Sequence, residues 1–149
     1  MNVDQLVVAD TGALLSPGLH DGAFLGMLIF PNKKIQFFAK ELNGKVHCFV
    51  LTGVERFYAD DFREGNIILD ITVESGGKVV RQDISEIFGS SGSVLAEASI
   101  SDIMKKFATR DFILVRLNTS YGGWFVCVCT GIEMLKNWTS EMAVLANWE

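Results

Sequence analysis

The chain has 149 residues, of which 49% are hydrophobic and 21% charged, so it can bury a substantial core and is not disordered as a whole. This length suits one domain spanning residues 1–149. The formal net charge of −5 disfavours nucleic acid as a partner, because an acidic surface repels the phosphate backbone.

Nothing in the sequence predicts membrane insertion or secretion. The uncharged stretch 117–132 contains Asn118, Thr119 and Ser120, which favours a β-hairpin over a membrane helix. The first Lys or Arg is Lys33, so the positively charged start of a signal peptide is missing. Three cysteines without a dense framework are typical of reduced thiols, and we expect a cytoplasmic protein that contacts no membrane.

In chain order, the first notable feature is "GLHDG", which places His20 beside Asp21. A His–Asp pair can act as a general base with its orienting carboxylate, but adjacent residues of a strand point to opposite faces and do not pair easily. We favour a turn, and keep His20 and Asp21 as candidate binding residues. Residues 23–30 are apolar at both parities, which predicts a strand buried on both faces and ended by Pro31.

Residues 33–55, "KKIQFFAKELNGKVHCFVLTGVE", predict a β-hairpin. Asn43-Gly44 is a strong signal for a two-residue turn, because both residues tolerate a positive φ. That turn pairs residue 39 with residue 48. It gives one core face, made of Ile35, Phe37, Ala39, Cys48 and Val50.

An offset of 78 residues lays this hairpin without a gap over residues 111–133, "DFILVRLNTSYGGWFVCVCTGIE". Thr52, Gly53 and Glu55 coincide with Thr130, Gly131 and Glu133, and the face patterns agree. The match predicts two similar hairpins, each leaving its second strand through a glycine that bends the chain out of the sheet. The alternative is that unrelated hairpins share the general turn and patterning rules.

The densest polar cluster, "ERFYADDFREGN" at residues 55–66, is predicted to be a connection between strands. Loops often carry function, and Arg and Tyr are residues that anchor interfaces. The alternative is a solvated connection whose charges pair with one another. The candidate binding residues in this cluster are Arg56, Tyr58, Asp60, Asp61 and Arg63.

Residues 67–74 alternate cleanly, which predicts a strand with residues 67, 69, 71 and 73 on one face. Gly76-Gly77 predicts a tight return into a short strand "KVV". "DISEIF" predicts a helix capped by Asp83 with Glu86 completing a capping box, and "SDIMKKFATR" predicts a second helix capped by Ser101. Residues 94–100 fit either an extension of that helix or a strand.

The cysteines do not predict a metal site. Zinc sites use paired C-x₂₋₄-C spacings, whereas Cys127 and Cys129 form C-x-C in a strand, and Cys48 has the opposite parity to His47. We expect buried thiols, no bound metal and no cofactor. No nucleophile elbow, Walker motif or dinucleotide-binding glycine pattern occurs in the sequence.

The tail from residue 134 onward is rich in apolar residues and includes Trp138 as a candidate binding residue. Its apolar surface needs a cover, which is either the protein's own sheet or a second copy in a symmetric homodimer. Together these patterns predict a mainly β fold of the α+β type. We expect a curved antiparallel sheet, as a sandwich or partly open barrel, with two similar hairpins and one or two short helices.

The segments "HDG" and "GVERFYADDFREGNIILD" resemble those of short bacterial β-rich proteins of unassigned function, some of which look like immunity proteins of toxin systems. The resemblance covers about residues 20–73. It implies a non-catalytic binding module of bacterial origin, and it assigns a role to no individual residue.

Two functional hypotheses follow. The first is a non-catalytic interaction protein, of the toxin-neutralising type or self-associating, and a flat apolar patch would favour it. The second is a small-molecule binder or enzyme with a site near His20, His47 and the loop from Arg56 to Arg63. Titratable groups converging on one cavity would favour the second.

Overall fold

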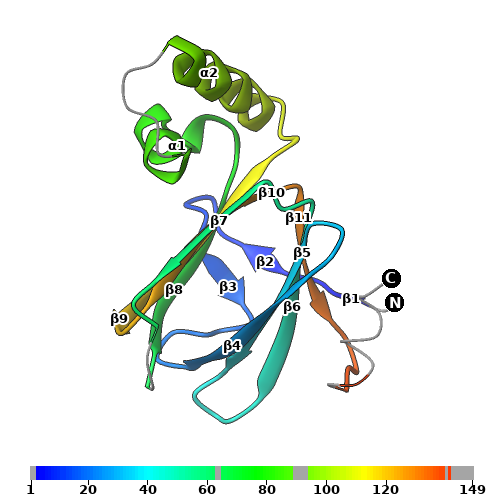
Figure 1. The fold of residues 1–149 in the computed structure, drawn as a ribbon. Helices are drawn as coiled ribbons and strands as arrows, with labels where there is room; N and C mark the ends of the chain where they lie inside the picture. The colour runs from blue at the N-terminus through cyan, green and yellow to red at the C-terminus, as the bar shows by residue number, and fades with distance from the viewer. Residues whose placement is uncertain (1–2, 63–64, 89–93, 140, 142–149) are drawn as a thin grey trace.

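The computed structural model describes residues 3–62, 65–88, 94–139 and 141 of the chain (Figure 1). The mainly β fold predicted from the sequence is confirmed. In chain order the elements are β1 (Val3–Asp4), β2 (Val7–Val8), β3 (Leu14–Ser16), β4 (Ala23–Phe30), β5 (Lys34–Lys40), β6 (Val46–Thr52), β7 (Arg56–Asp60), β8 (Ile67–Glu74), the 3-10 turn η1 (Gly76–Lys78), α1 (Arg81–Phe88), α2 (Val94–Ala108), β9 (Ile113–Tyr121), β10 (Trp124–Cys129) and β11 (Gly131–Leu135).

One antiparallel sheet contains nine of these strands, in the order β1-β11-β6-β5-β4-β8-β9-β10-β7. It is open, with β1 and β7 as its ends. Its two halves meet where β4 and β8 share the single pair Ala23 and Ile67. We call β1, β11, β6, β5 and β4 the β5–β6 half, and the other four strands the β9–β10 half. Figure 1 shows the two halves facing each other, with the small β2–β3 sheet between them.

The main core lies between the two halves and is rich in phenylalanine. The Phe37 ring stacks on Phe49 at 4.7 Å between centroids and meets Phe125 edge-on at 5.3 Å. Phe24 packs beside them, 6.3 Å from Phe37. Offset and edge-to-face contacts of this kind favour a fixed arrangement of rings.

The outer faces of both hairpins are also covered. Helices α1 and α2 pack their apolar residues Ile84, Ile100 and Phe107 against Leu114 and Val128 of the β9–β10 half. On the β5–β6 half, a smaller cluster joins Cys48, Val50 and Leu135 with Phe38 and Trp138. Both hairpins are therefore buried on two sides, which explains why they are apolar at both parities.

The predicted register of the first hairpin is wrong by one residue. β5 pairs with β6 as Phe37 opposite Phe49 and Ala39 opposite His47, so the loop contains three residues, 42–44. Gly44 donates its N–H to Glu41 O and has φ +95°, the left-handed conformation that closes a three-residue loop. A slip of one residue turns every side chain of β6 over, so Phe49 and Leu51 face the main core, while Cys48 and Val50 face outward.

The second hairpin has the same register as the first. The pairs Ile35–Leu51 and Phe37–Phe49 of the first hairpin correspond, at the offset of 78 residues, to Ile113–Cys129 and Val115–Cys127 of the second. The expectation of two similar hairpins is thus confirmed, although the predicted turn was wrong in both.

The repeated Thr-Gly segments mark a crossing of the chain. After β6, the chain passes Gly53 and forms β7, which pairs with β10 of the other hairpin. After β10, it passes Thr130 and forms β11, which begins at Gly131 and pairs with β6 of the first hairpin. The two crossings touch, because Thr130 donates its N–H to Thr52 O at 2.9 Å and its hydroxyl to the same oxygen at 3.0 Å.

Two predicted strands exist but expose different faces from those expected. β4 is not buried on both faces, since Leu28 and Ile29 are exposed, and most of its edge toward β8 has no ladder pairing within the described residues. In β8 the alternation breaks at a bulge near Leu69. Ile68 and Ile71 are therefore both buried, while Leu69 is exposed.

The helical region also differs from the prediction. The "KVV" segment forms no strand, and Gly76–Lys78 is a 3-10 turn that leads into α1. α1 begins at Arg81, so Asp83 lies in its first turn and does not precede the helix as predicted. The Asp83 carboxylate accepts a hydrogen bond from Val80 N at 3.4 Å, just before the helix. Residues 94–100 are helical, and Ser101 lies inside α2, where it accepts a hydrogen bond from Arg81.

Candidate functional site

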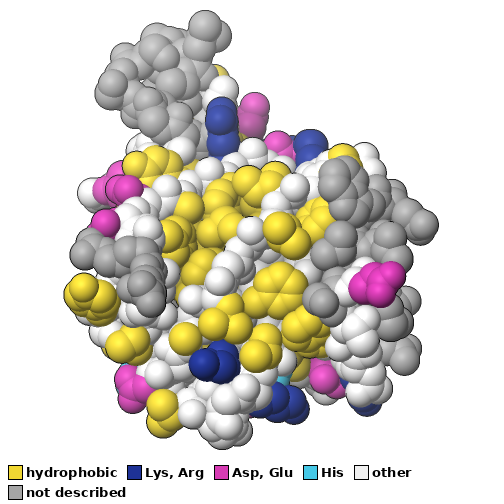
Figure 2. Space-filling view, turned by 60° about the horizontal axis from the view of Figure 1, so that its bottom comes forward, with side chains coloured by type: hydrophobic (Ala, Val, Ile, Leu, Met, Phe, Trp, Pro, Cys, Tyr) yellow, Lys and Arg dark blue, Asp and Glu magenta, His cyan; other side chains and the backbone are white. Residues whose placement is uncertain are grey.

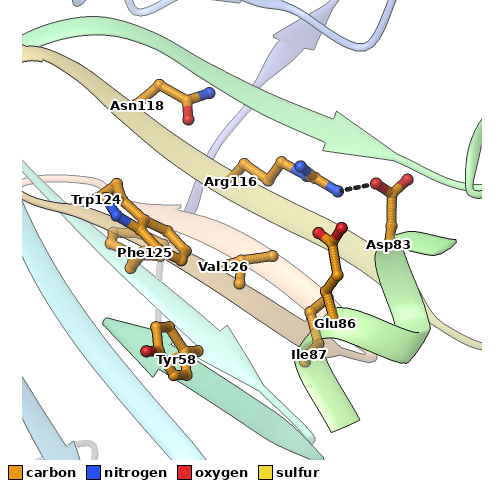
Figure 3. Close-up of a pocket in the computed structure, with 9 residues that line it drawn as sticks. All are labelled: Tyr58, Asp83, Glu86, Ile87, Arg116, Asn118, Trp124, Phe125 and Val126. Carbon is orange, nitrogen blue, oxygen red and sulfur yellow. Dashed lines mark ion pairs between the residues drawn. The ribbon is translucent and has the colours of Figure 1, made fainter. Parts of the chain in front are cut away.

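A cavity of about 340 Å³ lies between helix α1 and the outer face of the β9–β10 half (Figure 3). Its size is within the usual range for sites that hold small ligands. The described lining residues come from four elements: Tyr58 from β7, Asp83, Glu86 and Ile87 from α1, Arg116 and Asn118 from β9, and Trp124, Phe125 and Val126 from β10.

One wall is aromatic. β7 and β10 pair with Tyr58 opposite Val126, which makes Tyr58 and Trp124 diagonal neighbours on one face of the sheet. Their rings stack with centroids 5.2 Å apart, yet Tyr58 remains 48% exposed and Trp124 39% exposed. Large rings with this much accessible surface beside a cavity are available to a ligand.

The other walls are polar. Arg116 donates from Nη2 to Asp83 Oδ1 at 2.8 Å, an ion pair that ties β9 to the first turn of α1 (Figure 3). The Nε of Arg116 is buried without a hydrogen-bond partner among the described residues. Asn118 donates from Nδ2 to Asp70 at 2.8 Å. Glu86, one turn after Asp83, accepts a hydrogen bond from Gln82 at 3.3 Å.

Of the candidate binding residues that the structure describes, only Tyr58 lines this cavity. Arg56, Asp60 and Asp61 are exposed on or just after β7, which is an edge strand where the sequence predicted a loop. Arg63 lies outside the described residues. Trp138 packs on Phe38 at 5.2 Å between ring centroids, as part of the cluster over the β5–β6 half.

The two histidines do not converge with that loop. His20 and Asp21 are both well exposed, with Nδ1 and Oδ2 3.2 Å apart, so the expectation that they would not pair is wrong. Asp21 has φ +62°, a turn conformation that brings the two side chains together. His47 is buried in β6 of the first hairpin, with its Nε2 atom 2.9 Å from Glu41 Oε2. The predicted site near His20, His47 and Arg56 is therefore not one site.

All three cysteines are free and buried, as predicted. Cys48 lies in the cluster under Trp138, on the face opposite Ala39, and burial raises the pKa of its thiol to about 12. A hydrogen bond with Cys129, together with burial, also raises the pKa of Cys127. Within the part of the chain that the structure describes, no three His, Cys, Asp or Glu side chains are grouped to hold a metal ion.

The cavity residues that the sequence did not indicate have weak signals. Arg116 is a single charge inside the apolar run "ILVRL", and Trp124 directly follows the Gly-Gly of the second hairpin. Asp83 and Glu86 were assigned to helix capping alone. A charged residue within an otherwise apolar strand usually has a partner, and Arg116 is therefore the clearest of these signals.

A comparison of the chain with protein-family models, curated proteins and solved structures finds no match. Of the helices in the described residues, none combines the length and the apolar character needed to cross a membrane.

Proposed function

We propose that this chain is a non-catalytic binding protein that holds its ligand in the cavity between α1 and β10. The observation that carries the proposal is the half-exposed Tyr58–Trp124 stack on the cavity wall. Aromatic side chains that could be buried in a core are here left open to a space of about 340 Å³. A ligand that covers these two rings removes their apolar surface from water, which makes binding favourable.

The polar walls support binding in preference to chemistry. The Arg116–Asp83 pair and the Asn118–Asp70 bond fix the shape of the cavity before any ligand enters. None of the described lining residues is a serine, cysteine or histidine, and the carboxylates of Asp83 and Glu86 are bonded to Arg116 and Gln82. These features are those of a pre-formed binding site.

We expect small aromatic compounds to bind at this cavity with dissociation constants on the order of 1 mM, as fragments of this size usually do. The measurement is the NMR signal of the Trp124 indole N–H, assigned by its loss in Trp124→Phe, during titration with cationic, neutral and anionic compounds. Tyr58→Ala should weaken binding by at least fivefold. Tyr121→Ala removes a similarly exposed ring outside the cavity and should leave binding unchanged. If no compound of any charge shifts the Trp124 signal, the proposal is wrong.

A second candidate function, self-association, rests on strand β4. The strand "AFLGMLIF" contains no charged residue, and its Leu25, Leu28 and Ile29 are exposed along an edge that pairs with β8 only at Ala23. Figure 2 shows hydrophobic side chains gathered over a broad area of one face of the molecule. Uncharged apolar edges readily pair with another strand, and an antiparallel pair of β4 strands would be symmetric.

For this second candidate we expect sedimentation equilibrium to show a dimer with a dissociation constant on the order of tens of micromolar. Ile29→Lys should yield a monomer, because a lysine on the edge blocks strand pairing. Leu42→Lys introduces the same charge at an exposed leucine in the β5–β6 loop and should remain dimeric. A wild-type protein that sediments as a monomer would contradict the candidate.

The tail and the bacterial resemblance remain separate hypotheses. Met134, Leu135 and Trp138 pack against the protein's own sheet, so this part of the tail is covered within the chain. The apolar residues of the rest of the tail fall within 142–149, which lies outside the described residues. A toxin-neutralising role is supported by the sequence resemblance alone, and a homodimer through the tail stays a prediction.

A further inference from the structure

We infer that the cavity between α1 and β10 takes an organic cation, namely a flat amidinium or guanidinium, or an ammonium carried on an apolar body. This inference rests on the proposed binding function and adds the chemical class of the ligand. It follows from three features of the cavity: its net charge, its hydrogen-bonding capacity and its aromatic wall.

The cavity has one negative charge that no described cation neutralises. Its charged residues are Asp83, Glu86 and Arg116, which sum to −1. The guanidinium of Arg116 is already bound to Asp83 at 2.8 Å. Among the described residues, Glu86 accepts a hydrogen bond from one neutral donor, the amide of Gln82 at 3.3 Å. An anionic ligand would approach Arg116 past two carboxylates, whereas a cation would meet Glu86 with an open carboxylate oxygen.

Two of the polar groups are acceptors, the carboxylate of Glu86 and the amide oxygen of Asn118, whereas the buried Nε of Arg116 and the indole N–H of Trp124 are donors. Asn118 uses one N–H of Nδ2 as a donor to Asp70, and its amide oxygen is an acceptor on the cavity wall. In Figure 3 that oxygen lies on the side of Asn118 nearer to Trp124 and Arg116, and the Glu86 carboxylate lies across the cavity. Acceptors on two sides favour a ligand with several N–H donors.

The aromatic wall suits the same ligand. Cations are attracted to the faces of Trp and Tyr by the ring quadrupole, and planar guanidinium groups also stack on them. The outer faces of the Tyr58–Trp124 stack remain accessible, since the two rings are 48% and 39% exposed. Ile87 and Val126 add apolar surface for the body of the ligand.

Three probes of nearly the same shape test the inference: benzamidine, which is cationic at neutral pH, benzamide, which is neutral, and benzoate, which is anionic. Each is titrated into the full chain while the Trp124 indole N–H signal is followed by NMR. We expect benzamidine to bind at least tenfold more tightly than benzamide, and benzoate to cause no saturable shift. Raising the salt concentration should weaken the binding of benzamidine and leave the binding of benzamide unchanged.

Glu86→Gln should reduce the affinity for benzamidine about fivefold to tenfold and leave that for benzamide unchanged, because the amide keeps the shape and removes the charge. Glu133→Gln makes the same change at an exposed residue of β11 that does not line the cavity, and should have no effect. Equal binding of benzamidine and benzamide, or stronger binding of benzoate, would overturn the inference and leave the binding function standing. The absence of any shift with all three probes would overturn both.

Discussion

Gly53→Ala is expected to destabilise the fold by more than about 3 kcal/mol, through steric overlap and backbone strain. Gly53 has φ +60°, a conformation that costs an alanine about 1 kcal/mol. A Cβ atom at this position would also overlap the hydroxyl of Thr130 and lie 2.7 Å from its Cγ2. The two crossing segments cannot separate to relieve this overlap, because Thr130 donates two hydrogen bonds to Thr52 O.

Gly76→Ala is the matched control, because it measures the cost of backbone strain without the steric overlap. Gly76 has nearly the same φ, +62°, and a Cβ there would have no atom within 4 Å. It should therefore cost only about 1 kcal/mol in urea unfolding. Adding Thr130→Ala to Gly53→Ala removes the overlapping hydroxyl and methyl groups, and should restore part of the lost stability. Equal effects of Gly53→Ala and Gly76→Ala would show that the crossing is not packed as described.

The Thr-Gly segments show what a repeated pattern can and cannot predict. The offset of 78 residues identified both hairpins and their common register relation. The exchange of the following strands was not predictable, because β7 and β11 carry no pattern that distinguishes pairing with one hairpin from pairing with the other. Such long-range pairing depends on the whole sheet and not on local sequence.

The register error has a local cause. Asn43-Gly44 satisfies a two-residue turn and equally satisfies a three-residue loop in which Gly44 alone needs a positive φ. Alternation of apolar and polar residues normally decides between two registers, but here helices and the tail bury the second face of each hairpin. Cys48 and Phe49 are therefore both buried, and the sequence offers no contrast to separate them.

The candidate site was harder to predict than the fold for a similar reason. Tyr58, Asp83 and Arg116 come from three separate parts of the chain, and no spacing rule connects them. The polar cluster at residues 55–66 includes Tyr58 among charged neighbours, and of these Arg56, Asp60 and Asp61 are exposed and do not line the cavity. The residues that line the cavity with Tyr58 come from α1, β9 and β10, and β10 lies beside β7 because the chain crosses at Thr52 and Thr130.

The face that β5 presents to the main core gives the second large effect. Phe37→Ala is expected to destabilise the protein by about 3–5 kcal/mol, because a ring that is 1% exposed and packed against Phe49 and Phe125 leaves a cavity in the main core. Phe38→Ala deletes the same ring from the opposite face, where the side chain is half-buried under Trp138, and should cost about 1–2 kcal/mol. Both are measured by urea unfolding, with equal slopes as the test that only stability has changed. A larger loss of stability for Phe38→Ala than for Phe37→Ala would mean that β5 presents its other face to the core. Neighbouring residues in a strand point to opposite faces, so Phe37 and Phe38 cannot both face the main core.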